Sequence, residues 1–307
     1  MQRGSSMEEF MFSLKDGKEI FMRYFNALGE APTILYLHGG PGMHCEDFHC
    51  AAHHLSKSFN VIMFDQRGVV RSEAIHSDEA LSVQMLVDDC EYIREYYKID
   101  KWILLGHSFG GLLALLYAYQ YPNAVQAVIY ENANWGTLDA IRTIHQHTIK
   151  VLLNHGNHEL VHLVEEKLTS SNDVKELVNL LHQMPQIVLD EVYDNKPLTD
   201  EVKKYWLLGD VDDAHWNSSK IHQDKIFEDE ANNKSFLPYL KRIHCPSLLI
   251  KGDKDPVMSK YWVEYFLNYS PNSNIEVVKD CGHIVHMDQV ENFCDITINW
   301  LNKIAFN

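Results

Sequence analysis

Short, uninterrupted apolar runs that alternate with helical stretches are the feature that most restricts the fold of this chain. The predicted strands lie at residues 20–24, 33–37, 61–64, 102–105 and 125–130. Apolar residues at helical spacing follow at 81–97 and 109–121. Strands that are apolar along their whole length are buried on both faces, as in parallel sheets. The order of elements therefore predicts an α/β fold, with a mostly parallel sheet and helices on both faces.

The alternation is interrupted for roughly one hundred residues in the second half of the chain. This stretch reads as helical and polar, rich in His, Asn, Asp and Glu, without a convincing buried strand. Strand and helix order resumes at 246–250 and 275–278, and a closing helix is predicted at 290–304. We therefore predict one core domain from residues 1–134 and 241–307, with a helical cap inserted at 135–240.

Charge and cysteine content limit the partners and the compartment. The chain has 27 Lys and Arg against 43 Asp and Glu, a formal net charge of −16. Such an acidic surface argues against nucleic acid, an anionic membrane or a polyanionic substrate as a partner. The expected partner is a small-molecule or short-peptide substrate. Six cysteines without a CxxC pair predict reduced thiols and a cytoplasmic protein. Residues 1–6 lack the apolar segment of a signal peptide and resemble a cloning remnant before Met7.

A serine stands at the centre of the sequence Gly106-His107-Ser108-Phe109-Gly110, which matches G-x-S-x-G. An apolar strand precedes this sequence and an amphipathic helix follows it. This context is typical of the strand–turn–helix that exposes a nucleophilic serine above the edge of a sheet. Small residues suit the turn because its backbone is strained and passes close to its neighbours. We predict that Ser108 is a nucleophile.

A nucleophilic serine needs a histidine base, and the base needs an acid that orients it. In this arrangement the chain order is serine, acid, histidine. Asp255 follows the strand at 246–250, and His283 follows the strand at 275–278, so both fall at the predicted active edge. We assign them as acid and base. Asp253 is the alternative acid, and His286 is the alternative base.

Acyl transfer also requires donors for the developing oxyanion. One donor is expected to be the backbone N–H of Phe109, the residue after the nucleophile. The other is expected from the glycine-rich loop after residue 37, at Gly40. This loop ends a predicted buried strand at the same sheet edge as Ser108.

Three motifs in order resemble the proline iminopeptidase family of α/β hydrolases. They are His38-Gly39-Gly40-Pro41-Gly42, Asp65-Gln66-Arg67-Gly68 and Gly106-His107-Ser108-Phe109-Gly110-Gly111. The resemblance implies the α/β-hydrolase fold with an inserted cap and no metal or organic cofactor. It also implies release of an N-terminal proline or another small residue from short peptides through an acyl-enzyme. We place Gly39, His107 and Trp135 at the substrate site. Because relatives with this core also cleave esters and lactones, a carboxylesterase or lactonase is the alternative.

Two positions depart from the family pattern. Val70 stands where glycine is common after the second motif. The family's cap also carries a tryptophan-flanked glutamate that holds the substrate amino group, and this cap has no clean copy of it. If the substrate is a peptide N-terminus, a cap acid should pair with its ammonium group. The candidate residues are Trp135, Trp206, Trp216, Glu131, Asp139, Asp210, Asp212 and Asp213.

Two histidine patterns leave a zinc metallohydrolase as a further alternative. His158, Glu159 and His162 form H-E-x-x-H, which on a helix puts both imidazoles on one face. Cys45, His49 and His53 recur every four residues, a spacing that also suits a metal. A non-catalytic receptor on the same fold is the remaining class, although no residue of the predicted triad is missing.

Overall fold

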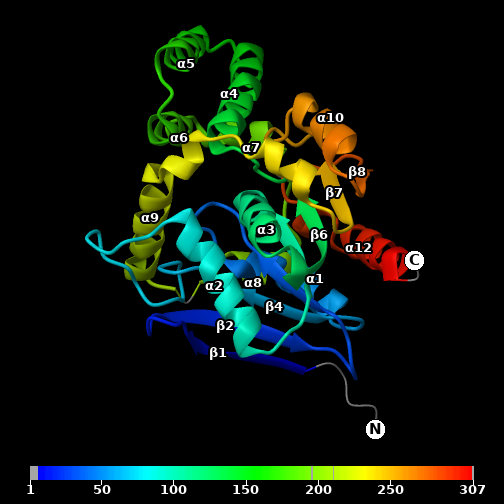
Figure 1. Cartoon of the computed structure of the whole chain (residues 1–307). Helices are drawn as coiled ribbons and strands as arrows, with labels where there is room; N and C mark the ends of the chain where they lie inside the picture. Colours follow the sequence, from blue (N-terminus) through cyan, green and yellow to red (C-terminus); the bar gives the residue numbers. More distant parts are fainter. Residues whose placement is uncertain (1–5, 195, 210, 306–307) are drawn as a thin grey trace.

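The computed structural model describes residues 6–194, 196–209 and 211–305, and it is built on an eight-stranded sheet (Figure 1). The strand order is β1-β2-β4-β3-β5-β6-β7-β8, in which β1, β2 and β4 pair antiparallel and the remaining pairs are parallel. The strands are β1 (Ser6–Ser13), β2 (Glu19–Asn26), β3 (Thr33–Leu37), β4 (Asn60–Phe64), β5 (Trp102–His107), β6 (Val125–Glu131), β7 (Ser247–Gly252) and β8 (Ser273–Val278).

The central strands bury both of their faces, because successive side chains of a strand point to opposite sides of the sheet. In β3, Leu35 and Leu37 pack into one core, whereas Ile34 and Tyr36 pack into the other. Each large apolar side chain buried in this way contributes roughly 1.5–3 kcal/mol. The solid apolar runs in the sequence therefore reflect two cores that share one sheet.

Helices cover both faces of the sheet. One core is completed by α2 (Val83–Tyr96), α3 (Phe109–Gln120) and α10 (Lys260–Tyr269), and the other by α1 (His49–Leu55) and α12 (Val290–Ala305). The predicted helices correspond to α2, α3 and α12. The short α11 (Val285–Asp288) and the 3₁₀ turns η1 (Cys45–Phe48), η2 (Pro122–Ala124), η3 (Glu230–Asn233) and η4 (Leu237–Arg242) lie between larger elements.

A helical insertion separates β6 from β7, as the sequence predicts. It contains α4 (Thr137–Asn154), α5 (His158–Ser170), α6 (Val174–His182), α7 (Gln186–Tyr193), α8 (Asp200–Trp206) and α9 (Asp213–Glu228). Four of these helices follow a residue whose side chain accepts a first-turn N–H, which fixes where they begin. These residues are Asn157, Asp173, Thr199 and Asp212. Figure 1 shows the green helices α4, α5 and α6 standing above the sheet.

Strand β1 and three core helices are absent from the sequence-based prediction. Strand β1 begins at Ser6, within the segment interpreted as a cloning remnant, and its side chains are mostly exposed. The rest of that segment, residues 1–5, lies outside the described residues. The three helices are α1, α10 and α11. Within the ranges given above, none of the helices combines the length and apolar character that crossing a bilayer requires.

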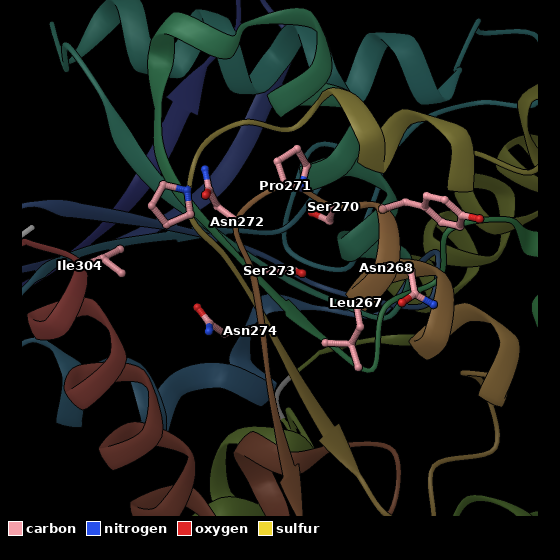
Figure 2. A pocket seen from close by; sticks show the side chains of 10 residues that line it. Leu267, Asn268, Ser270, Pro271, Asn272, Ser273, Asn274 and Ile304 are labelled. Atoms are coloured by element: carbon pink, nitrogen blue, oxygen red, sulfur yellow. The ribbon is translucent and has the colours of Figure 1, made fainter.

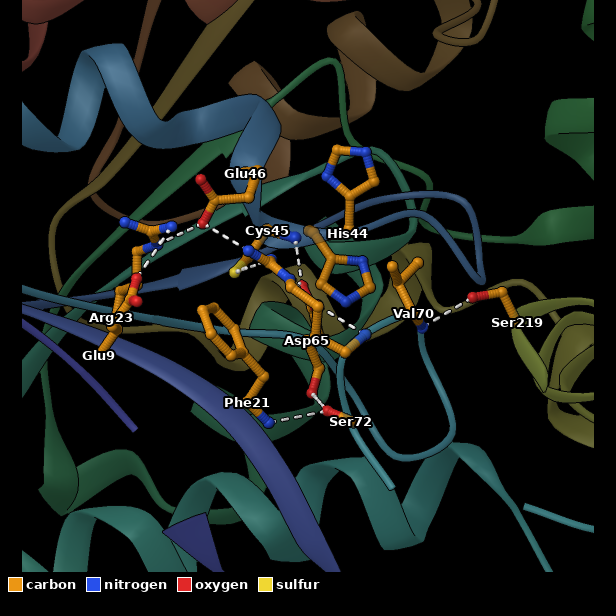
Figure 3. A network of polar contacts seen from close by, with 12 residues as sticks. Glu9, Phe21, Arg23, His44, Cys45, Glu46, Asp65, Val70, Ser72 and Ser219 are labelled. Carbon is orange, nitrogen blue, oxygen red and sulfur yellow. Dashed lines mark hydrogen bonds and ion pairs between the residues drawn. The ribbon is translucent and has the colours of Figure 1, made fainter. Parts of the chain in front are cut away.

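A buried ionic network ties the loop after β3 to the loop after β4 (Figure 3). Asp65 accepts the Cys45 N–H at 2.8 Å and the Arg71 Nε–H at 2.8 Å, and Arg71 also lies 2.9 Å from Glu46. Burial alone would raise the pKa of Asp65, but the Arg71 guanidinium lowers it to about 2. The Asp65 carboxylate thus stays charged and holds the segment that follows Gly42 in place.

Val70 has a left-handed backbone, with φ 36°. This conformation is costly for a β-branched residue and free of strain for glycine. Val70 thus has the left-handed backbone that a glycine would adopt without strain at this position. The Val70 N–H donates to Ser219 Oγ of α9 at 2.9 Å, and the Val70 side chain is fully buried, so cap contacts support it.

A hollow of about 690 Å³ lies away from the carboxyl ends of the parallel strands, near the start of β8 (Figure 2). It is lined by residues from the end of α10 through Asn274, with Pro246 and Ile304. None of the residues that the sequence predicts to be catalytic lies among its described lining residues.

His222 of α9 joins the cap to the core, with its Nδ1 2.6 Å from the carbonyl oxygen of Arg67. Burial lowers the pKa of this imidazole to about 3, whereas an unfolded histidine titrates near 6.5. Between these two pH values the unfolded chain binds a proton that the folded chain does not. The free energy of unfolding should therefore fall as the pH falls through this window.

We expect His222 to account for a loss of roughly 2 kcal/mol in the free energy of unfolding between about pH 7.5 and about pH 5.0. The variant His222→Gln keeps an N–H donor for Arg67 but does not titrate, so it should lose that much less over the same interval. Urea unfolding at both pH values measures the difference. The exposed His162→Gln serves as control and should behave as wild type. An unchanged pH dependence in His222→Gln would contradict a buried neutral imidazole.

Candidate active site

Ser108 occupies a sharp turn between the end of β5 and the start of α3. Its backbone angles, φ 52° and ψ −118°, lie in a region that non-glycine residues rarely adopt. Backbone hydrogen bonds hold it there: the Ser108 N–H donates to the Glu131 carbonyl, and the Ser108 carbonyl accepts from Asn134. Strain of this kind costs about 1–3 kcal/mol and is common where a side chain must be presented for chemistry.

Two glycines allow this turn because backbone passes directly over them. A Cβ on Gly110 would lie 1.9 Å from the Leu37 carbonyl oxygen, and one on Gly106 would lie 2.3 Å from the Gly110 oxygen. No side chain fits in either gap. The G-x-S-x-G spacing thus follows from the packing of α3 against the ends of β3 and β5.

The predicted base and acid are in direct contact. His283 Nδ1 lies 2.6 Å from Asp255 Oδ1, and both side chains are almost fully buried. The Asp255 carboxylate also accepts the Met258 N–H at 2.9 Å, which fixes its orientation. With the Nδ1 proton donated to Asp255, His283 has Nε2 free to act as a base, and His283 lines the same cavity as Ser108.

The alternative acid and base have other roles. The Asp253 side chain is partly exposed and accepts the Cys281 N–H at 3.2 Å. His286 is completely buried, with its Nδ1 2.7 Å from Glu131 Oε2 and its Nε2 3.7 Å from Asp47 Oδ2. Burial alone would lower the pKa of His286, but these two carboxylates raise it to about 10. The imidazole is therefore protonated near neutral pH, and in that form it cannot accept a proton from serine.

The glycine-rich loop after β3 lies next to Ser108 and the start of α3. Gly40 has φ 113°, and a Cβ there would lie 2.7 Å from the backbone nitrogens of Gly42 and Met43. A Cβ on Gly39 would lie 3.0 Å from Ser108 Cβ. Gly39 and Gly40 both line the cavity, and Phe109 is the first residue of α3, where an N–H has no partner inside the helix. This placement is compatible with the predicted oxyanion donors.

A cavity of about 370 Å³ lies between the core and the cap, above Ser108. Its core side includes Gly39, Gly40, Asp47, His107, Ser108 and His283. Its cap side includes the apolar residues Ala140, Ile141, Ile144, Val178, Leu181 and Phe227. The cavity thus has a polar floor and a largely apolar roof.

Trp135 lies in the core rather than at the cavity. Its ring is fully buried and stacks on Phe266, with ring centroids 5.5 Å apart, and it meets Tyr130 edge-on. It is not among the described residues that line the cavity, unlike Gly39 and His107, which the sequence also placed at the substrate site. The sequence could not distinguish these outcomes, because a tryptophan just after β6 suits either location.

The expected cap acid is not found among the described cap residues that line the cavity. Asp139, Asp212 and Asp213 are exposed, Asp210 lies outside the described residues, and Glu131 is buried at the end of β6. Of the candidate tryptophans, Trp206 does line the cavity. The carboxylate that reaches the cavity belongs instead to Asp47, which the core supplies.

A cluster of buried polar groups lies behind Ser108. His107, Glu131 and His286 bring ligand-type atoms within 4.8 Å of one another, an arrangement that suits a metal. However, Glu131 already accepts both the ring and the backbone N–H of His286, at 2.7 and 2.9 Å, and lies 3.4 Å from His107 Nδ1. These contacts account for the cluster as a hydrogen-bonded ion pair. Sequence reasoning left the role of Glu131 undefined.

The two other histidine patterns do not assemble a site in the described structure. His158, Glu159 and His162 lie on an exposed face of α5, in the cap. Cys45 is buried in η1, whereas His53 is exposed on α1.

A family model described as the alpha/beta hydrolase fold matches residues 32–290. The chain therefore belongs to the α/β-hydrolase family, and the predicted fold is confirmed. Along 94% of its length it is related to proline iminopeptidases. It is 25% identical over 303 residues to the proline iminopeptidase of Heyndrickxia coagulans, covering 96% of that protein. It is 24% identical over 293 residues to that of Lactobacillus helveticus, covering 95% of that protein.

Solved structures show the same fold at lower identity. The proline iminopeptidase of Mycobacterium smegmatis superposes with a TM-score of 0.73 at 18% identity, over 97% of this chain and 98% of that one. An esterase from Thermogutta terrifontis superposes with a TM-score of 0.66 at 18% identity, over 97% of this chain and 99% of that one. The two neighbours differ in their named activities, so these likenesses support the fold alone.

The contact between Asp255 and His283 predicts a large effect of Asp255→Asn. An asparagine amide would favour the wrong imidazole tautomer, so kcat should fall roughly 10³- to 10⁴-fold without loss of folding. The rate of 4-nitrophenyl acetate hydrolysis measures the fall in kcat, and thermal unfolding checks that the variant is folded. Asp253→Asn is the matched control, because its amide oxygen can still accept the Cys281 N–H. A larger loss in Asp253→Asn than in Asp255→Asn would reverse the assignment.

Proposed function

We propose that this chain is a serine hydrolase that cleaves a carboxylic amide or ester through an acyl-enzyme on Ser108. The observation that carries the proposal is the 2.6 Å contact between His283 Nδ1 and Asp255, which leaves Nε2 available in a cavity that Ser108 also lines. Asp255 orients the imidazole and stabilises its charged form.

In the proposed reaction Ser108 Oγ attacks the substrate carbonyl carbon while His283 Nε2 removes the hydroxyl proton. The N–H groups of Gly40 and Phe109 hold the oxyanion that forms. His283 then donates its proton to the leaving amine or alcohol as the bond to the carbonyl carbon breaks. Water, deprotonated by His283, attacks the acyl-enzyme and releases the acid and the free serine.

For the substrate we propose short peptides with an N-terminal proline or another small residue. Relatives named proline iminopeptidases align with 94% of the chain, which supports this class. Of the described residues that line the cavity, Asp47 is the one with a carboxylate. Burial alone would raise the pKa of Asp47, but His286 lowers it, so the carboxylate is charged. We assign Asp47 to the substrate ammonium group.

The apolar roof of the cavity favours a second candidate. Ala140, Ile144 and Leu181 offer no hydrogen bonds to a peptide, and they suit the apolar acyl or alcohol part of a small ester. A carboxylesterase uses the same triad as an amidase. We therefore retain small-ester hydrolysis as the alternative.

A paired assay of wild type and Ser108→Ala distinguishes these activities. We expect wild type to cleave both proline 4-nitroanilide and 4-nitrophenyl acetate, and Ser108→Ala to lose at least about 10³-fold in kcat on each. Cleavage of the ester alone, still dependent on Ser108, would replace the peptidase by the esterase. Full activity in Ser108→Ala would refute the serine mechanism.

The role of Asp47 predicts a substrate-dependent effect of Asp47→Asn. An unpaired charge in a buried site costs about 2 kcal/mol or more, so kcat/KM for proline 4-nitroanilide should fall about 30-fold or more. Cyclopentanecarboxylic 4-nitroanilide has the same ring without the amine and serves as the matched substrate. Its kcat/KM should change less than about threefold. Equal losses on both anilides would show that Asp47 acts on the site as a whole.

A further inference from the structure

Asn132 follows Glu131 at the end of β6 and is completely buried. Its side chain is bonded at both ends to backbone groups. Oδ1 accepts the Gly252 N–H at 3.1 Å, and Nδ2 donates to the Gly282 and His283 carbonyl oxygens at 3.2 and 2.7 Å. Its own backbone N–H donates to the Ile250 carbonyl at 3.1 Å.

These partners belong to the two loops that carry the proposed acid and base. Gly252 ends β7 and begins the turn that presents Asp255, whose N–H donates to the Gly252 carbonyl at 3.2 Å. Gly282 immediately precedes His283. One amide group therefore connects the acid loop, the base loop and the end of β6.

The surroundings leave little freedom for any other arrangement. A Cβ on Gly252 would lie 2.1 Å from the Gly282 carbonyl oxygen, so the two loops are in backbone contact. Asn132 itself has φ 40°, a left-handed conformation that asparagine tolerates better than most residues. A strained, buried residue persists only where its surroundings hold it, and such residues concentrate at functional sites.

We propose that Asn132 is a positioning residue that sets the distance between His283 and Asp255, and this inference rests on the proposed serine mechanism. Without the Asn132 amide, the base loop loses the hydrogen bond to the His283 carbonyl and the acid loop loses the hydrogen bond to the Gly252 N–H. Asn132 is not among the described residues that line the cavity, so its loss should affect turnover rather than substrate binding.

The test is Asn132→Asp, which keeps the size, the acceptor for Gly252 and the left-handed backbone. A carboxylate has no donor and a carboxylic acid has one, so the variant loses at least one of the two hydrogen bonds to the Gly282 and His283 carbonyls. A displacement of about 1 Å at a reacting group costs roughly 10²-fold, so we expect kcat on 4-nitrophenyl acetate to fall about 10²-fold with KM within about threefold. Asn132→Gly, which adopts φ 40° without strain, should show the same pattern if the aspartate variant folds poorly.

Asn60→Asp is the matched control. Asn60 lies at the start of β4 and likewise bridges two backbone groups, accepting from Ala27 at 2.9 Å and donating to Ala31 at 3.0 Å. It should lose stability but keep kcat. The second readout is the downfield proton NMR resonance of the His283 Nδ1–H, which should be present in wild type and Asn60→Asp and shifted or lost in Asn132→Asp.

The outcomes separate this inference from the proposed function. Equal rates in wild type and Ser108→Ala would refute the serine mechanism, while the NMR resonance would still report on the contact between His283 and Asp255. Hydrolysis through Ser108 with unchanged kcat and an unchanged resonance in Asn132→Asp would overturn the positioning role alone. A comparable loss of kcat in Asn60→Asp would also overturn it, because the effect would then reflect general destabilisation.

Discussion

The candidate active site depends on a hydrogen bond of 2.6 Å between two residues on different loops, His283 and Asp255. Parallel pairing of β7 with β8 puts both loops at one edge of the sheet, but pairing alone does not fix their separation to a fraction of an ångström. The Asn132 amide, the Met258 N–H and the backbone contact of Gly252 with Gly282 supply the remaining constraints. Polar contacts therefore fix the distance between His283 and Asp255, while the apolar sheet fixes which edge their loops share.

Burying charge behind the nucleophile requires that the charges be paired. Glu131 and Asp47 are both negative and His286 is positive, so the group retains one net negative charge, and the carboxylate that lines the cavity floor is that of the buried Asp47. Removing one partner of such a group leaves an uncompensated buried charge, which is strongly destabilising. The cluster thus holds α11 against β6 and η1, and it sets a negative potential on the floor of the cavity.

Local sequence pattern predicts most of the strands of the core. It predicts fewer of the contacts in the candidate active site. The runs at 33–37 and 102–105 predict β3 and β5 because a strand buried on both faces must be apolar throughout. Ser108, Asp255 and His283 follow from motif and chain order. Glu131 and Asn132 do carry a signal, as polar residues that end an apolar strand at the active edge. Several of their partners, however, lie 120 to 155 residues away in the sequence, so their roles depend on tertiary contacts. The sequence also does not predict strand β1 or the location of Trp135 in the core, since neither has a local pattern that specifies its neighbours.

The cap contributes to the chemistry as well as to the shape of the cavity. Tyr193, the last residue of α7, accepts the His283 N–H on its carbonyl oxygen at 3.3 Å, and its ring lies 5.7 Å from the imidazole. A Cβ on Gly282 would lie 2.2 Å from the same carbonyl, so the glycine before the base is required by the cap. Because α7 touches the base directly, changes in the cap that alter substrate fit can also alter the position of His283. The backbone contact between Tyr193 and His283 therefore links the shape of the cap to the position of this imidazole.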